Sequence, residues 1–209
     1  MNKFAALIPM KDLNLGKSRL SSSLNPVERS KLVMNMFIRV LRASLESSCS
    51  KVFVVGQDEG IKSVAESMGA DWIEAAGSNL NSDLLYAIRS IQMQGYSLIC
   101  IPGDLPFVTV SDIDLVIDEV SAKETVGLVS SLSDGGTNCL AIPSDNYFQP
   151  SFGLNSFERH QAQGIKRGIE TIVIDAASMF LDVDTEVDLK ECENIEPGFT
   201  DRLGASVDN

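Results

Sequence analysis

Apolar residues follow two patterns along the chain: short unbroken runs, and longer stretches in which they recur every three or four positions. Unbroken runs are typical of buried strands, and the recurring pattern is typical of helices with one buried face. The predicted strands are residues 4–8, 51–55, 70–74, 97–101, 126–130, 138–142 and 171–174. The predicted helices are residues 26–46, 61–68, 81–93, 111–120, 156–163 and 186–192.

Helix boundaries are marked by residues that cap helix ends. Asn25 precedes a proline at the first helical position, Pro26, and an acid two residues later, Glu28, which is a strong start signal. The helix that begins at residue 156 meets Gly164, which we expect to end it.

Strands that alternate with helices predict an α/β fold, a three-layer sandwich around a mainly parallel, mixed sheet. We expect one domain over residues 1–195 and a loose polar tail over residues 196–209. In such sheets, ligands bind outside the carboxyl ends of the strands, so polar residues at those ends are the first candidates for a site.

Charge narrows the choice of ligand. The 209 residues carry 17 Lys and Arg against 29 Asp and Glu, a net charge of −12. This balance argues against a general nucleic-acid binder and against a protein that binds anionic membranes, because both rely on cations. A small phosphorylated ligand remains compatible, since it needs only a local cluster of cations or a metal ion.

The remaining composition indicates an intracellular setting. The four cysteines are widely spaced and predict neither a zinc site nor a disulfide framework. The first residues lack the pattern of a signal peptide, and no apolar run approaches the roughly 20 residues of a membrane span. We therefore expect a cytoplasmic protein.

Three cations follow the first predicted strand: Lys11, Lys17 and Arg19. Backbone amides and cations at this place in an α/β fold can bind phosphates. A solvated surface loop explains the same residues equally well. No GxxxxGK[ST] loop or GxGxxG fingerprint is present.

Carboxylates occur at two other strand ends. Asp104 follows the strand at residues 97–101 and lies between two prolines, while Asp182 and Asp184 point the same way if their segment is extended. Mg²⁺ is usually held by one or two carboxylates together with substrate phosphates. Turn and helix capping are the structural alternatives for these residues.

Glycines and hydroxyls mark a third region. Gly135 and Gly136 allow a ligand to approach the backbone, and Thr137 and Ser156 add hydroxyls. Ser156 also opens a helix, whose N-terminus attracts anions. A hairpin turn followed by an ordinary helix start is the alternative interpretation.

Two further polar residues have weaker signals. Asn81 opens the helix at residues 81–93 and either contacts a nucleoside or simply caps the helix, which is the commoner case. His160 is the single histidine, and a lone histidine is more often structural than catalytic. No catalytic triad or HExxH motif can be built around it.

Taken together, the order of the motifs is specific. They read IPMK at 8–11, KSRL at 17–20, NLN at 79–81, IPGDLPF at 101–107, GGTNCLAIP at 135–143, FGLNSF at 152–157 and LDVDT at 181–185. In this order the chain resembles, over residues 4–189, the phospholactate or phosphoenolpyruvate guanylyltransferases of deazaflavin coenzyme F-420 biosynthesis. The resemblance implies a nucleotide-diphosphosugar-transferase-like fold.

The resemblance also implies a reaction and the residues that perform it. GMP would pass from GTP to phosphoenolpyruvate, 2-phospho-L-lactate or 3-phospho-D-glycerate, with Mg²⁺ as cofactor and pyrophosphate released. The residues implied to bind GTP are Lys11, Lys17, Arg19 and Asn81. Those implied to hold the metal are Asp104, Asp184 and Asp182. Those implied to bind the acceptor acid are Thr137, Gly153 and Ser156. The implied catalytic residues are Lys17, Asp104 and Asp184.

Some points stay open at this stage. Departures from the family pattern at residues 134–137 and 154–155 leave the acceptor acid undecided. A molybdopterin-guanine or sugar-phosphate nucleotidyltransferase is one alternative, disfavoured because the first loop has only Gly16. A non-catalytic GTP-binding protein is another. The sequence also leaves open whether the chain forms a homodimer.

Overall fold

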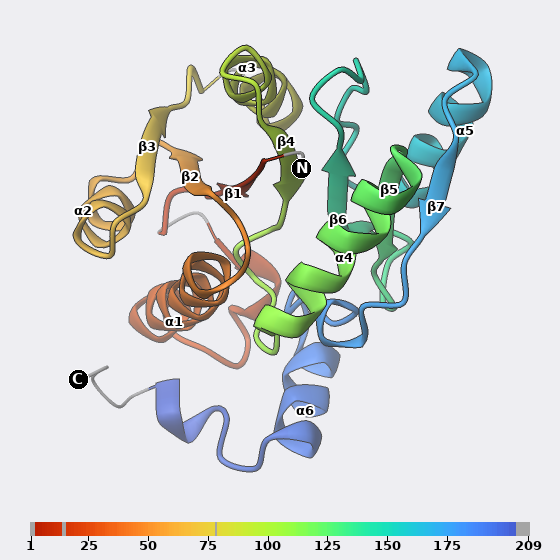
Figure 1. Ribbon diagram of the computed structural model, residues 1–209. Coiled ribbons are helices and arrows are strands. Elements are labelled where there is room, and N and C mark those ends of the chain that lie inside the picture. The colour runs from red at the N-terminus through yellow and green to blue at the C-terminus, as the bar shows by residue number, and fades with distance from the viewer. Residues whose placement is uncertain (1–2, 14–15, 78, 204–209) are drawn as a thin grey trace.

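The computed structural model describes residues 3–13, 16–77 and 79–203, which form one sheet with helices on both faces (Figure 1). The strands are β1 (Phe4–Pro9), β2 (Lys51–Gly56), β3 (Asp71–Glu74), β4 (Ser97–Cys100), β5 (Val126–Ser130), β6 (Thr137–Ile142) and β7 (Thr171–Val173). The helices are α1 (Pro26–Glu46), α2 (Glu59–Ser67), α3 (Leu80–Gln92), α4 (Val110–Lys123), α5 (Ser156–Arg167) and α6 (Glu186–Ile195). Every predicted strand and helix is present, with boundaries that differ by a few residues.

The sheet has seven strands in the order β3-β2-β1-β4-β6-β5-β7. The pairs β1–β2, β1–β4, β2–β3 and β5–β7 are parallel, whereas β6 runs antiparallel to both β4 and β5. The prediction of a mainly parallel, mixed sheet is confirmed. The carboxyl ends of β1 and β4 lie side by side, because these two strands are paired in parallel.

Both faces of the sheet are covered by helices. Ala6 and Ile8 of β1 belong to the core that contains residues of α1, α2 and α4. Ala5 and Leu7, which point the other way, belong to the core with α3, and Phe157 of α5 packs against this second core. These three layers confirm the sandwich architecture.

The start of α1 follows the predicted cap. The Asn25 side chain accepts hydrogen bonds from the backbone N–H groups of Val27 and Glu28, and the Glu28 carboxylate accepts one from the Asn25 N–H. This reciprocal pair satisfies N–H groups that the helix itself leaves without partners. Within the described part of the chain, no helix has both the length and the apolar character needed to cross a membrane.

The predicted end of α5 at Gly164 is wrong. The helix continues through Gly164 to Arg167 and ends at Gly168. A Cβ atom at Gly164 would lie 2.6 Å from Thr171 Cγ2 and 2.8 Å from the Ile169 carbonyl oxygen. The glycine is therefore in the helix to let β7 pack closely against it, not to end it.

The expectation of a loose tail from residue 196 is also wrong for residues 196–203. Phe199 is buried, with its ring centroid 5.8 Å from that of Phe107. The Arg39 guanidinium lies over the Phe199 ring and forms an ion pair with Glu196 at 3.1 Å. Residues 204–209 of the predicted tail lie outside the described residues.

The end of β2 packs closely against the first loop. The Met10 N–H donates to the Val55 carbonyl at 2.8 Å. A Cβ atom at Gly56 would lie 2.9 Å from the Met10 carbonyl oxygen and 3.0 Å from Cη2 of Trp72. Only a glycine leaves room for the Met10 backbone and the Trp72 ring to lie against this position.

Candidate active site

A cleft of about 360 Å³ opens at the carboxyl ends of β1 and β4. Its size is in the range of small-molecule sites. The lining residues come from the end of β1, the loops after β1 and β4, one position of α1, the start of α3 and the segments before α5 and α6. They are Pro9, Met10, Lys11, Asp12, Gly16, Lys17, Ser18, Arg19, Val33, Leu80, Pro102, Gly103, Asp104, Phe152 and Asp184.

Five of the predicted site residues line this cleft together. They are Lys11, Lys17, Arg19, Asp104 and Asp184. They come from three segments that are far apart in the sequence, so the fold has placed three cations and two carboxylates around one cavity. This arrangement is what a site for a polyphosphate and a divalent cation requires.

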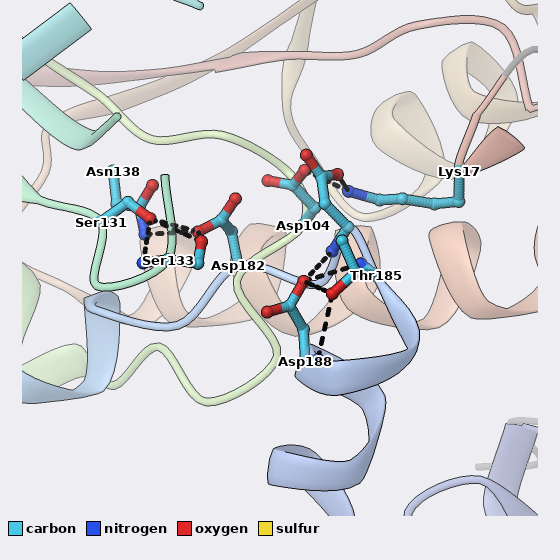
Figure 2. A network of polar contacts seen from close by, with 9 residues as sticks. Lys17, Asp104, Ser131, Ser133, Asn138, Asp182, Thr185 and Asp188 are labelled. Carbon is cyan, nitrogen blue, oxygen red and sulfur yellow. Dashed lines mark hydrogen bonds and ion pairs between the residues drawn. The ribbon is translucent and has the colours of Figure 1, made fainter. Parts of the chain in front are cut away.

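Lys17 connects the two carboxylates. Its Nζ atom lies 2.5 Å from Oδ2 of Asp104 and 2.7 Å from Oδ1 of Asp184. Its side chain is only 7% exposed, and its backbone adopts the left-handed conformation, with φ 52° and ψ 40°. Figure 2 shows Lys17 reaching across to Asp104. The sequence predicted phosphate contacts for this ammonium, but here its partners are the predicted metal ligands.

Hydrogen bonds of their own backbone groups hold Asp104 and Asp184 in place. Asp104 follows β4, and its carbonyl accepts a hydrogen bond from the Val183 N–H at 3.3 Å. Asp184 immediately precedes the cap of α6, and its N–H donates to Asp188 at 3.0 Å. Thr185 and Asp188 form the capping box that starts α6, as Figure 2 shows.

Protonation states follow from this geometry. Burial alone would lower the pKa of Lys17, but the charges of Asp104 and Asp184 outweigh it and raise the pKa well above its ordinary value. Burial raises the pKa of Asp184, but Lys17, with Arg19 and Lys11 farther away, reverses the effect and leaves that pKa lowered. The site therefore holds a charged ammonium and an ionised Asp184 at neutral pH.

Asp182 does not join the other two carboxylates in a cluster. Its Oδ1 accepts hydrogen bonds from Ser131 at 2.8 Å, Asn138 at 3.2 Å and Ser133 at 3.4 Å (Figure 2). Burial, followed by the nearby charge of Asp104, raises its pKa. Across residues 3–13, 16–77 and 79–203, no group of three or more His, Cys, Asp or Glu side chains is placed to hold a metal ion.

Asn81 does not line the cleft, although its neighbour Leu80 does. Its Oδ1 accepts from the Phe152 N–H at 2.7 Å, and its Nδ2 donates to the Phe152 carbonyl at 3.1 Å. The helix cap is Asn79, not Asn81. Asn81 therefore fixes the backbone of Phe152, and Phe152 forms part of the cleft wall.

None of the three predicted acceptor residues lines the cleft. Thr137 and Ser156 are buried, with their hydroxyl oxygens 3.2 Å apart. Gly153 is next to Phe152, and its carbonyl accepts from the Ser156 N–H at 3.0 Å. Thr137 also contacts Nδ1 of His160 at 2.9 Å. The structure thus brings the three predicted residues together beside Phe152, outside the lining of the cleft.

Sequence reasoning missed several residues that shape this site. Met10, Leu80 and Phe152 line the cleft, and Asn138 binds Asp182. Met10, Leu80 and Phe152 are apolar and adjoin charged or polar motifs, so nothing in their spacing distinguishes them from core residues. All four lie within the quoted motifs, but Asn138 is the polar member of the group, and its side chain could have been indicated as a hydrogen-bonding residue.

Comparison with known proteins identifies the family. The family described as guanylyl transferase CofC like matches residues 4–194. The chain belongs to this family. It is therefore an enzyme, a nucleotidyltransferase of the guanylyltransferase type.

Similar proteins of this family differ in the acid that their names state. A phosphoenolpyruvate guanylyltransferase of Sphaerobacter thermophilus is 31% identical over 97% of this chain and 96% of its own length. A 2-phospho-L-lactate guanylyltransferase of Methanothermobacter thermautotrophicus is 32% identical over 90% and 83%. A 3-phospho-D-glycerate guanylyltransferase of Phenylobacterium zucineum is 30% identical over 84% and 83%. Identities this similar leave the acid open.

Solved structures confirm the fold of this guanylyltransferase. A putative nucleotide-diphospho-sugar transferase from Desulfovibrio desulfuricans superposes with a TM-score of 0.76, covering 97% of this chain and 91% of that one. The two sequences are 12% identical, so the likeness concerns architecture. The predicted nucleotide-diphosphosugar-transferase-like fold is confirmed.

Proposed function

We propose that this protein transfers GMP from GTP to a phosphorylated three-carbon acid: phosphoenolpyruvate, 2-phospho-L-lactate or 3-phospho-D-glycerate. The observation that carries the proposal is the pair Asp104 and Asp184 converging on one cationic group in a cleft that also contains Lys11 and Arg19. The names of the similar guanylyltransferases support the choice of acids.

The chemistry needs little from a general base. An anionic oxygen of the acid's phosphate attacks the α-phosphorus of GTP, forming a P–O bond as the bond to the β-phosphate breaks. Pyrophosphate leaves with the bonding electron pair. Since the nucleophile is already ionised, positioning and charge stabilisation provide the catalysis. Lys11 and Arg19, which line the cleft, would supply positive charge for the departing pyrophosphate.

The residues present fit a magnesium ion. Asp104 and Asp184 offer hard oxygen ligands that already face one cation, the Lys17 ammonium. Two carboxylates completed by substrate phosphates are a usual Mg²⁺ environment. When bound, Mg²⁺ would offset the phosphate charge. Lys17 would then be available to bind phosphate oxygens, as the family resemblance implies. Asp182, held by Ser131 and Asn138, is the less accessible third candidate.

We assign acceptor binding to the group of residues beside Phe152. Thr137, Gly153 and Ser156 would hold the acid, with hydroxyl and backbone donors suited to phosphate or carboxylate oxygens. Because Thr137 and Ser156 are buried, the segment that carries Phe152 has to move or admit the acid alongside it. Asn81 acts on the same segment and so influences the nucleotide indirectly.

Pyrophosphate release by the purified protein tests the proposal. The assay contains Mg²⁺ and GTP with each of the three acids in turn, and ATP in place of GTP as the nucleotide control. We expect release with GTP and at least one acid, which also names the acceptor. A protein that binds GTP but releases pyrophosphate with none of the acids would contradict the proposal and favour another acceptor or a non-catalytic role.

A further inference from the structure

His160 is the only histidine of the chain and lies fully buried in α5, yet the reaction described above does not use it. Both ring nitrogens have partners. Nε2 accepts a hydrogen bond from the Ser151 N–H at 2.8 Å, and Nδ1 lies 2.9 Å from Oγ1 of Thr137. The rings of Phe148 and Phe152 pack against the imidazole, with centroids 5.9 and 5.4 Å away.

These contacts define which nitrogen carries the proton. The Ser151 backbone amide can only donate, so Nε2 must be the accepting nitrogen. Burial, with the charge of Arg159 as a smaller cause, lowers the pKa of His160 to about 4, so the ring is neutral at pH 7. In a neutral imidazole the other nitrogen is then protonated. Nδ1–H therefore donates to Thr137.

The Thr137 hydroxyl is oriented as a result. Its oxygen receives hydrogen bonds from His160 Nδ1 and from Ser156 Oγ, the latter at 3.2 Å. A hydroxyl oxygen has two lone pairs, and both are used here. Within the described part of the chain these two groups are the hydrogen-bond partners of the Thr137 hydroxyl, so its hydrogen is available to a further acceptor. A hydroxyl donor forms its strongest hydrogen bonds with an anionic oxygen, such as that of a phosphate or carboxylate.

The second nitrogen of His160 acts on the cleft wall. By accepting from the Ser151 N–H, it holds the segment that continues into Phe152 and Gly153. Phe152 lines the cleft, and its backbone is held from the other side by Asn81. One imidazole thus connects the Thr137 hydroxyl on β6 with the segment that forms part of the cleft wall.

We propose that His160 is a positioning residue for the acceptor acid: it directs the Thr137 hydroxyl hydrogen toward the acid and holds residues 151–153 in place as the wall of the acid's subsite. The inference rests on the proposed function, because it assigns the acid to this subsite. His160 itself does not touch the substrate. An imidazole suits the task because it donates and accepts at opposite edges of one rigid ring.

Three variants separate the two hydrogen bonds. His160→Asn places an amide near the position of Nδ1 and keeps a donor for Thr137. His160→Gln reaches the position of Nε2 and keeps an acceptor for Ser151, while His160→Leu keeps neither. We expect KM for the acid to rise about tenfold in each single-bond variant and about 100-fold in His160→Leu. KM for GTP should rise by a smaller factor than KM for the acid in all three variants, because Asn81 still holds the Phe152 backbone at the cleft.

Gln163→Ala is the matched control. Gln163 lies one turn farther along α5 and holds Gln149 through two hydrogen bonds of 2.9 Å. It therefore also connects α5 to the segment that precedes residues 151–153, but it forms no hydrogen bond with Thr137 or Ser151. We expect its KM values for both substrates to match those of the wild type. Circular dichroism and thermal unfolding of all variants report whether each is folded.

A second measurement does not depend on turnover. Because the chain has one histidine, the imidazole region of a ¹H–¹⁵N spectrum reports His160 alone. We expect protonated Nδ1 and unprotonated Nε2 at pH 7, with the Nδ1 resonance shifting when phosphoenolpyruvate, 2-phospho-L-lactate or 3-phospho-D-glycerate is added. The Nε2–H tautomer, or no shift with any of the three acids, would overturn the inference. So would an equal rise of both KM values in a folded His160→Leu protein.

The two proposals fail in different ways. Wild-type protein that transfers GMP to none of the acids contradicts the proposed function, whatever the state of the imidazole. Wild-type protein that transfers GMP, combined with an unchanged KM for the acid in folded His160→Leu, contradicts only the role of His160.

Discussion

Lys17 shows how much a single residue contributes to this site. Left-handed backbone conformations cost a residue with a side chain roughly 1 kcal/mol, and Lys17 has φ 52°. The conformation turns its side chain into the cleft, where Asp104 and Asp184 compensate for the loss of solvent. Without an ammonium between them, two carboxylates in this position would repel each other.

Replacing Lys17 by Met tests this role, because the side chain keeps its length and loses its charge. We expect kcat to fall at least about 100-fold, since a group that stabilises transition-state charge is lost. We also expect nucleotide-free protein to bind Mn²⁺ about tenfold more tightly, because the ammonium no longer competes for the carboxylates.

Electron paramagnetic resonance of free Mn²⁺ measures this affinity. Asp104→Asn is the counterpart: it should abolish turnover and weaken Mn²⁺ binding while the protein stays folded. An unchanged Mn²⁺ affinity in Lys17→Met would show that ammonium and metal do not share a site.

The buried imidazole predicts a pH dependence of stability. The pKa of His160 is lowered from 6.5 to about 4 in the folded protein. As pH falls below 6.5, the unfolded chain binds a proton that the folded chain does not, so the free energy of unfolding decreases between pH 6.5 and 4. The loss from this group is on the order of 3 kcal/mol.

Urea denaturation at several pH values measures this dependence. In His160→Gln the decrease between pH 6.5 and 4 should be smaller than in the wild type by that amount. Parallel curves for the two proteins would mean that His160 already titrates near its ordinary pKa when folded.

Among the helices and strands, α5 makes contacts that constrain it at its start, its middle and its end. It begins beside Thr137, carries His160 in the middle and approaches β7 closely at Gly164. Its placement relative to the sheet therefore sets the position of the proposed acceptor subsite. Helix propensity alone would favour alanine over Gly164, but the neighbouring strand leaves no room for it.

Gly164→Ala should consequently destabilise the protein. Alanine in place of glycine inside a helix ordinarily stabilises by about 1 kcal/mol. Here the added Cβ atom meets Thr171 and the Ile169 carbonyl, and overpacking of this kind costs about 1–3 kcal/mol. Chemical denaturation gives the difference. Ala162→Gly, at an exposed position of the same helix, measures propensity alone; a stabilised Gly164→Ala protein would contradict the close-packing argument.

The spacing of apolar residues predicted the helices and strands, and the polar residues at the carboxyl ends of the strands predicted the position of the cleft. Lys11, Arg19 and Asp104 could be assigned to one site because parallel strands β1 and β4 end at the same edge of the sheet. The hydrogen bonds of Asn81 to Phe152, which is 71 residues away, could not be predicted, because no local pattern encodes a contact between a helix start and a distant loop.

The burial of Thr137 and Ser156 escaped prediction for the same reason. Their surroundings are formed by β6, α5 and the loop at residues 151–153, which meet only in the folded chain. Phe199 is a similar case: a single aromatic residue in a polar segment carries no periodic signal, although it fills a pocket beside Phe107.

For the whole molecule, a third small core joins the ends of the fold. Leu20, Met36, Val183 and Phe199 belong to this core, which connects the first loop, α1 and the segment around α6. The same segments carry Lys17 and Asp184. Packing in this core therefore helps to hold the two sides of the site together.

Phe199→Ala tests the contribution of this core. Truncating a buried phenylalanine costs about 3–5 kcal/mol in other proteins, and we expect a value near the lower end, because Phe199 lies in a terminal segment. Thermal unfolding measures the change, and Asp201→Ala, an exposed position in the same segment, is the control. A melting temperature equal to that of the wild type would show that residues 196–203 do not support the fold.

The close packing around Gly56 has a practical consequence. Trp72, the single tryptophan of the chain, lies against one side of Gly56, and the backbone of Met10 lies against the same position. Met10 lines the cleft. The protein therefore carries an intrinsic fluorophore next to the loop that lines the cleft, and the emission of Trp72 offers a label-free, real-time measurement of the proposed nucleotide binding.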